Sequence, residues 1–228
     1  MKEINLIDNL KERTVFSLQD VQRIGDYSRE YTKLVLNRLM KRKLIKKITK
    51  NRYTVQKDIF VIASNIKIPS YISFWSASSY YEFTEQILNT IHIACTRRIR
   101  PISFEGYKIK FIKVNQLFGY KKVKTNNGEI FIVNSEKLLI DCLLHFEEMG
   151  NFDEIEKVFQ KANISKETII EYLKKANNLS LTKRIGYLLE KYKKIDISKY
   201  FKIDRNYVYL NQFSKKQKQI NSKWRVYI

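Results

Sequence analysis

Residues 17–56 read SLQDVQRIGDYSREYTKLVLNRLMKRKLIKKITKNRYTVQ. Apolar residues recur at helical spacing in the first part, and Ser17 and Ser28 each stand where a helix N-cap is expected. After Lys43 the pattern changes to alternation around the polar turn 49–51, which is typical of two short paired strands. Helix, tight turn, helix and β-hairpin is the layout of a winged helix-turn-helix. This stretch therefore predicts a DNA-binding unit.

Charge is distributed unevenly along the 228-residue chain, which carries a formal net charge of +21. Residues 1–57 hold 15 basic and 6 acidic side chains, residues 58–160 hold 12 of each, and residues 161–228 hold 17 and 5. A uniformly lysine-rich chain would be basic throughout, so the neutral middle favours two functional basic zones with a nucleic-acid partner. Lysine-rich solvated helices are the alternative for the last zone.

The remaining composition indicates a cytoplasmic protein. Cys95 and Cys142 are too few for a disulfide framework and are expected to be reduced and buried. The first residues are charged throughout and predict an amphipathic helix, not a secretory leader. No apolar run approaches the ~20 residues of a membrane span, so no membrane partner is expected. For the oligomeric state, the sequence is compatible with both a monomer and a dimer.

Beyond Lys57 the sequence predicts a mixed domain with a small sheet and several helices. Residues 59–63 are read as a linker helix or strand. Strands are expected over 90–95, 101–104, 107–114, 129–133, 207–210 and 224–228, and helices over 71–81, 136–148, 152–161, 165–177 and 180–193. The predicted fold class is α+β: a winged helix-turn-helix over residues 1–57, then an α+β domain over 58–228 whose helical part is basic from about residue 161.

The second helix of the motif is expected to enter the DNA major groove, where its N-terminal residues reach base edges. Arginine bonds bidentately to guanine and asparagine to adenine, whereas serine, threonine and lysine commonly hold phosphates. The predicted DNA-contacting residues are Ser28, Arg29, Tyr31, Thr32, Lys33, Asn37 and Arg38 on the helix, and Lys46, Lys47, Lys50, Asn51 and Arg52 on or beside the hairpin. The alternative is a solvated face on a protein-interaction adaptor.

Two smaller basic groups are predicted as accessory nucleic-acid contacts. Arg97, Arg98 and Arg100 cluster in the otherwise neutral middle, and the planar, always charged guanidinium is a good phosphate ligand. Lys183 and Arg184 open a helix in the basic last third. A solvated arginine loop paired with Glu82 or Glu105 is the alternative for the first group.

Several further segments occur in a characteristic order. They are YISFWSASSYYEFTEQ (71–86), SEKLLIDCL (135–143), KRIGYLLE (183–190), NYVYL (206–210) and KWRVYI (223–228). With the predicted winged helix they make the chain resemble the AbiEi-family antitoxins, the transcriptional regulators of type IV toxin–antitoxin systems. The resemblance covers most of the chain, although this chain is more basic than expected for the family.

The resemblance implies a two-domain repressor. Its N-terminal part would bind double-stranded DNA at inverted repeats near its own promoter. Its second domain would antagonise a nucleotidyltransferase-like toxin without forming a stable complex with it. A solitary regulator without a toxin remains an alternative.

No enzyme motif is present: the sequence has no P-loop, G-x-G-x-x-G, H-E-x-x-H or nucleophile elbow. Glu136 and Asp141 lie five residues apart, which on a helix separates them by about 140°, so they do not share a face. Glu82 and Glu85 lack a third ligand in register, and the single histidines 92 and 145 are expected in the core or on the surface. No catalytic residue, metal or cofactor is therefore predicted. A metal-dependent nuclease is the enzymatic alternative.

Overall fold

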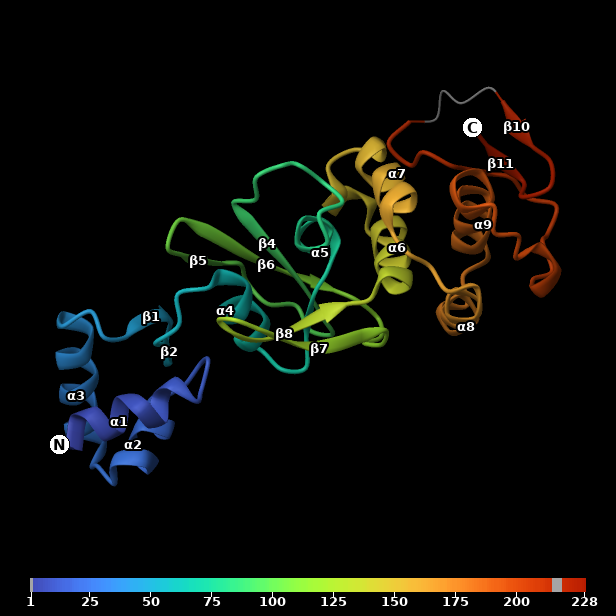
Figure 1. Ribbon diagram of the computed structural model, residues 1–228. Coiled ribbons are helices and arrows are strands. Elements are labelled where there is room, and N and C mark those ends of the chain that lie inside the picture. The colour runs from blue at the N-terminus through green and yellow to red at the C-terminus, as the bar shows by residue number, and fades with distance from the viewer. Residues whose placement is uncertain (1, 215–218) are drawn as a thin grey trace. The chain divides into compact units, whose positions relative to one another are not determined.

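The computed structural model describes residues 2–214 and 219–228 (Figure 1). These residues form two units. The first holds the described residues through Ile72 together with Asn89–Leu117 and Lys122–Ile132; the second holds Ser73–Leu88, Phe118–Lys121 and Val133–Ile228. Helices and strands are mixed in the way the α+β class requires, so that prediction is confirmed. The first unit extends beyond the boundary expected near Lys57, because later strands return to it.

Three helices and a hairpin open the chain. They are α1 (Lys2–Lys11), α2 (Leu18–Gly25), α3 (Arg29–Lys41), β1 (Lys46–Thr49) and β2 (Arg52–Thr54). The predicted caps are confirmed. Ser17 and Asp20 form a reciprocal capping box at α2, and the Ser28 hydroxyl accepts the Tyr31 backbone N–H at 3.2 Å. These bonds satisfy backbone donors that the first helical turn leaves open.

The residue that ends α2 in the left-handed conformation is Asp26, with φ of 50°, and not the preceding Gly25. Asparagine and aspartate tolerate this region better than most residues. Gly25 is required for another reason, since a Cβ there would lie 2.2 Å from the Tyr27 ring. The glycine lets the tyrosine pack against the end of α2.

A shared core joins these elements. It contains Leu6, Leu10, Phe16, Val21, Val35, Leu36, Leu39, Ile45 and Tyr53. Phe16 and Tyr53 exchange backbone hydrogen bonds of 3.0 and 2.8 Å, and their rings stack at 6.2 Å. The segment before α2 thus pairs with β2 and fixes the hairpin to the helices.

The capping box gives a testable pH dependence. Burial raises the pKa of Asp20. The hydrogen bonds from the Ser17 hydroxyl and backbone N–H and the charges of Arg13 and Arg23 together lower it by more, so the net shift is downward. A depressed carboxyl pKa stabilises the fold above the unfolded value near ~3.9, and that contribution is lost as pH falls through the folded value.

Substituting Asp20→Asn is therefore expected to cost about 0.5–2 kcal/mol at neutral pH. The difference from the wild type should shrink as pH falls below about 4, because the unfolded chain then binds a proton at Asp20 before the folded chain does. Urea unfolding of both proteins between neutral and acid pH measures it. A difference that does not change with pH would show that the charge of Asp20 contributes nothing.

The larger sheet has six strands in the order β5-β6-β4-β3-β8-β7. Their bounds are β3 Tyr71–Ile72, β4 Thr90–Cys95, β5 Ile102–Phe104, β6 Tyr107–Lys113, β7 Tyr120–Thr125 and β8 Gly128–Val133. β4 pairs in parallel with β6 over six residues and antiparallel with β3. Its residues from Ile91 to Cys95 are all buried, as expected for a strand covered on both faces.

Two details of this part were not fixed by the sequence. Residues 59–63 form a helix, α4 (Ile59–Asn65), because the Asp58 carboxylate accepts the backbone N–H groups of Phe60 and Val61. Strand β7 was missed. Its sequence YKKVKT is polar and largely exposed, which is typical of an edge strand and carries little apolar alternation.

Five α-helices form most of the second unit: α5 (Phe74–Tyr80), α6 (Ser135–Leu144), α7 (Phe152–Lys161), α8 (Lys166–Ala176) and α9 (Leu179–Lys193). The predicted helix over 136–148 is shorter than expected, since a separate 3-10 helix follows at Phe146–Met149. Its N-cap is Asn134, whose side chain accepts the Lys137 N–H at 3.1 Å and so satisfies one of the open donors of the first helical turn.

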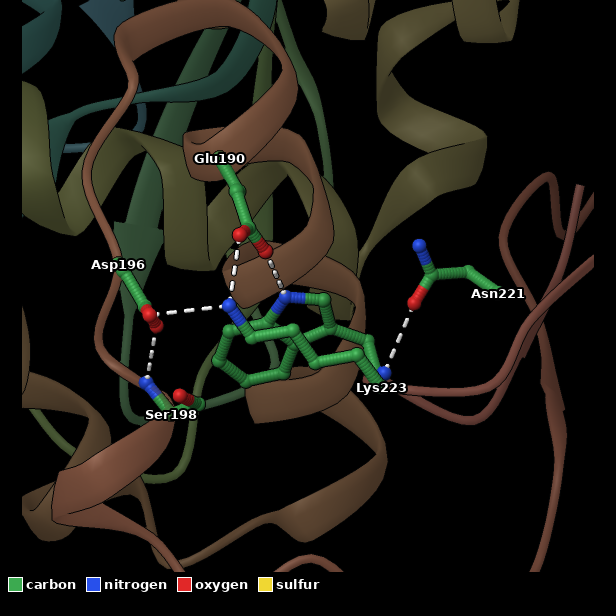
Figure 2. Close-up of polar contacts among 6 residues, drawn as sticks. Glu190, Asp196, Ser198, Asn221 and Lys223 are labelled. Atoms are coloured by element: carbon green, nitrogen blue, oxygen red, sulfur yellow. Dashed lines mark hydrogen bonds and ion pairs between the residues drawn. The ribbon is translucent and has the colours of Figure 1, made fainter.

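The chain ends in a three-stranded sheet of order β10-β11-β9, formed by β9 (Val208–Tyr209), β10 (Ile220–Asn221) and β11 (Val226–Tyr227). Figure 2 shows how this end is fixed. Lys223 Nζ lies 2.6 Å from Glu190 and 2.9 Å from Asp196, and the indole N–H of Trp224 donates to Glu190 at 2.6 Å. The Ser198 backbone N–H and Lys223 hold the pKa of Asp196 well below its usual range.

Trp224 is fully buried against α9, and Gly186 makes room for it. A Cβ on Gly186 would lie 2.2 Å from the six-membered ring. We expect Gly186→Ala to lower the free energy of unfolding by about 1–3 kcal/mol, because overpacking outweighs the gain in helix propensity.

Denaturant unfolding measures this cost, and the variant Trp224→Phe supplies the control. In that background the clashing ring atoms are gone, and Gly186→Ala should be neutral or stabilising. Equal costs in both backgrounds would mean that the glycine is needed for another reason.

No helix in residues 2–214 and 219–228 combines the length and the apolar character that crossing a membrane requires. Cys95 and Cys142 are both buried and unbonded to another cysteine, as expected.

Candidate nucleic-acid interface

Helix α3 has one buried side and one open side. Thr32, Val35, Leu36 and Leu39 are its buried residues. Successive residues turn by about 100° around a helix, so the direction opposite this stripe is occupied by residues 30, 34, 37 and 41. All four are exposed. The helix therefore presents a continuous open face along its length.

Most of the predicted contact residues of α3 lie outside the buried stripe. Ser28, Arg29, Tyr31, Lys33, Asn37 and Arg38 are exposed. Of these, Asn37 lies close to the middle of the open face. Tyr31 is 44% exposed, and its ring meets that of Tyr27 edge-on at 5.0 Å. The turn before α3 is thus held by an aromatic pair beside the N-cap.

The position of Thr32 contradicts its prediction. The sequence predicted it as a DNA-contacting residue, but its side chain is fully buried. The hydroxyl donates to the backbone carbonyl of Ser28, four residues earlier, at 2.8 Å. The prediction failed because threonine one turn into a helix satisfies its hydroxyl on the helix itself.

Three residues on the open face were missed. Glu30, Leu34 and Lys41 point away from the buried stripe, and Leu34 is 60% exposed although it is apolar. The signal was present in the sequence, since the spacing of Val35, Leu36 and Leu39 fixes the inward direction. A carboxylate can accept a hydrogen bond from a cytosine amino group, and an apolar side chain can contact a thymine methyl, so both groups are chemically able to interact with base edges.

The hairpin adds a basic edge. Lys47, Lys50 and Arg52 are exposed. Lys46 forms an ion pair with Glu105. Lys46 is thus balanced by a carboxylate, and Glu105 contacts this lysine instead of the arginine loop for which it was considered.

Asn51 has a structural role at the hairpin turn. It adopts a left-handed conformation, with φ of 57°, at the hairpin turn. Its side chain accepts the Leu18 N–H at 2.9 Å and donates to Gln19 at 2.9 Å. The amide therefore ties the hairpin tip to the start of α2, which fixes the basic edge relative to the helices.

The arginine cluster lies on the loop after β4. Arg97, Arg98 and Arg100 are all exposed. Arg97 lines a cavity of about 320 Å³ together with Lys67 and the end of β4. The structure therefore brings one of the three arginines beside a second cation.

The second accessory pair, Lys183 and Arg184, also differs from its prediction. Lys183 is 1% exposed, and its amino group contacts the Asp204 carboxylate and the Asn206 carbonyl. Arg184 Nε donates to the Tyr209 carbonyl at 2.8 Å. Lys183 joins α9 to the segment before β9, and Arg184 joins it to β9 itself. A lysine opening a helix in a basic region was predicted to be exposed because sequence alone did not show that the chain returns over this turn.

The groups considered for catalysis are occupied elsewhere. Glu136 accepts the Ser165 backbone N–H at 2.8 Å, while Asp141 accepts the Ser73 hydroxyl at 2.7 Å and pairs with Lys137. Burial and the charge of Lys110 lower the pKa of His92 to about 4, so its imidazole is neutral at pH 7. Within residues 2–214 and 219–228, no group of three or more histidine, cysteine or carboxylate side chains is arranged to hold a metal ion.

Comparison of the sequence with protein-family models gives no match, and comparison with curated proteins gives none. The site is therefore interpreted from its geometry: an open helical face with amide, carboxylate, apolar and cationic groups, followed by a basic hairpin.

Proposed function

We propose that this chain is a sequence-specific DNA-binding transcriptional repressor whose α1, α2, α3 and hairpin form a winged helix-turn-helix. In this proposal α3 lies in the major groove, and the β1–β2 hairpin contacts the adjacent backbone or minor groove. The observation that carries the proposal is the open face of α3, where Asn37 stands between Leu34 and Lys41 and Lys33 lies beside it.

The chemistry of this face is suited to base edges. Asparagine can bond bidentately to adenine, and an exposed leucine can contact a thymine methyl group. Exposed cations at Lys33, Lys47, Lys50 and Arg52 supply the phosphate contacts that fix register, and Arg29 can bond bidentately to guanine. An adaptor that binds a neutral protein surface has no need of this many uncovered cations beside one helix.

We extend the proposal to an antitoxin-type role, in which the repressor controls its own operon and counteracts a nucleotidyltransferase-like toxin. The support for this role is the ordered set of segments that resembles the AbiEi antitoxins. Inverted-repeat operators bind two copies of such a protein, related by the symmetry of the DNA.

A mobility-shift assay with the DNA upstream of the protein's own gene tests the proposal. We expect salt-sensitive binding that is at least 1,000-fold tighter, on the order of the usual specificity ratio, than binding to a composition-matched random duplex. Equal affinity for both duplexes would refute the repressor proposal.

A further inference from the structure

The small C-terminal sheet has two different faces. Val226 and Leu210 are buried, and β9 and β11 lie against α9, to which Arg184 ties the Tyr209 carbonyl. Val226 is in register with Val208, and Tyr227 with Tyr209. Because side chains alternate along a strand, Tyr207, Tyr209 and Tyr227 share the opposite face.

The three tyrosines form one aromatic cluster there. The ring of Tyr227 lies 5.0 Å from that of Tyr209 and 5.3 Å from that of Tyr207. Arg225 adds a cation, since its guanidinium lies 5.4 Å from the centre of the Tyr207 ring and donates to the Tyr207 hydroxyl at 2.9 Å. All four side chains are only partly buried. Ile220 lies on β10 in register with Tyr227 of β11. It is 56% exposed and extends this face.

The C-terminal part of the sequence is strongly basic. Residues 199–228 contain eight lysines and arginines and one acidic residue, Asp204. Asp204 pairs with Lys183, and one of the eight cations, Lys223, pairs with Glu190 and Asp196. An aromatic sheet face within such a segment combines a surface for planar rings with attraction for a polyanion. Proteins bind single-stranded nucleic acids with this combination, because unpaired bases stack on aromatic and guanidinium planes while cations follow the backbone.

We propose that the outer face of the β9–β11–β10 sheet, formed by Tyr207, Tyr209, Arg225 and Tyr227, binds single-stranded nucleic acid by base stacking. In a duplex the base faces are covered by their neighbours, so this surface selects unpaired strands. The site is separate in sequence and chemistry from the duplex site proposed on α3, and it extends the function of the chain beyond repression.

The test is fluorescence anisotropy with the full-length chain and labelled oligonucleotides of about twelve nucleotides, a length that fits one stacking platform. The probes are oligo-U RNA, oligo-dT DNA and a duplex. The protein carries Lys47→Ala and Arg52→Ala, which weaken the proposed duplex site. We expect it to bind a single strand more tightly than the duplex, and the stronger of the two single-strand signals identifies RNA or DNA as the ligand.

The ring-removing variants Tyr209→Leu and Tyr227→Leu should each weaken single-strand binding by about tenfold or more, since each removes a stacking partner. The matched variants Tyr209→Phe and Tyr227→Phe keep the ring and should stay within about twofold of the parent. Tyr107→Leu, an exposed tyrosine on β6, is the control for loss of an unrelated ring. Thermal unfolding identifies any variant that fails to fold. If a leucine variant fails to fold, single-strand binding is compared between the phenylalanine variants and Arg225→Gln instead.

Three results would overturn the proposal: no binding of either single strand, unchanged binding by the folded leucine variants, or an equal loss in the phenylalanine and leucine variants. Each leaves the duplex-binding proposal intact, because that proposal is measured on α3 variants and duplex DNA.

Discussion

Replacing Asp141 by alanine is expected to lower the free energy of unfolding by about 3–5 kcal/mol, the usual effect of removing one partner of a buried ion pair. Asp141 is fully buried, and its partner Lys137 is 2% exposed. The variant leaves the lysine charge in the interior without this carboxylate. It also removes the acceptor of the Ser73 hydroxyl, which bonds to Asp141 instead of capping α5.

Urea unfolding measures this loss, and a double variant supplies the control. Lys137→Met with Asp141→Leu removes both charges and places apolar side chains at both positions. It should be more stable than Asp141→Ala, since replacing both members of a buried pair by apolar groups is often neutral. If the double variant is as unstable as the single one, the ion pair is not the source of the loss.

The second large effect concerns DNA binding and separates two groups of side chains. Arg29→Ala with Asn37→Ala should reduce discrimination between the preferred duplex and random duplex by about 1–3 kcal/mol for each base that is no longer read. Lys47→Ala with Arg52→Ala should weaken all duplexes alike. It should also reduce the dependence of log affinity on log salt by about 0.9 for each phosphate that is no longer neutralised.

Titrations at several salt concentrations measure both quantities. The matched control is Lys113→Ala with Lys174→Ala, which removes two exposed cations far from α3 in the sequence. It should change neither discrimination nor salt dependence by as much as the hairpin pair. If the control pair weakens duplex binding as strongly as the hairpin pair, net charge and not the proposed surface governs affinity.

Local signals predicted the N-terminal elements well. The caps at Ser17 and Ser28 and the alternation around residues 49–51 depend on neighbours within a few positions, so the sequence contains the physical cause of each element. The division into units could not be predicted in this way. It depends on strand pairing such as β3 with β8, which joins residues about 60 positions apart.

The candidate site was likewise predicted only where local signals determine it. The apolar stripe of α3 determines which way Asn37 faces, and also determines that Thr32 faces inward. The roles of Lys46, Asn51 and Lys183 depend on partners that are distant in sequence: Glu105, the start of α2 and Asp204. Residue type alone indicated that these side chains were available for DNA, whereas the fold gives each of them a polar partner.

Selection of bound sequences from a random duplex library tests the central claim most directly, because it requires no knowledge of the operator. The wild-type chain is predicted to enrich an inverted motif whose half-sites lie about one helical turn, or a multiple of it, apart. The Asn37→Ala variant is predicted to lose the preference at one position of each half-site. Recovery of no motif by the wild-type chain, or of the same motif by both chains, would contradict recognition by α3.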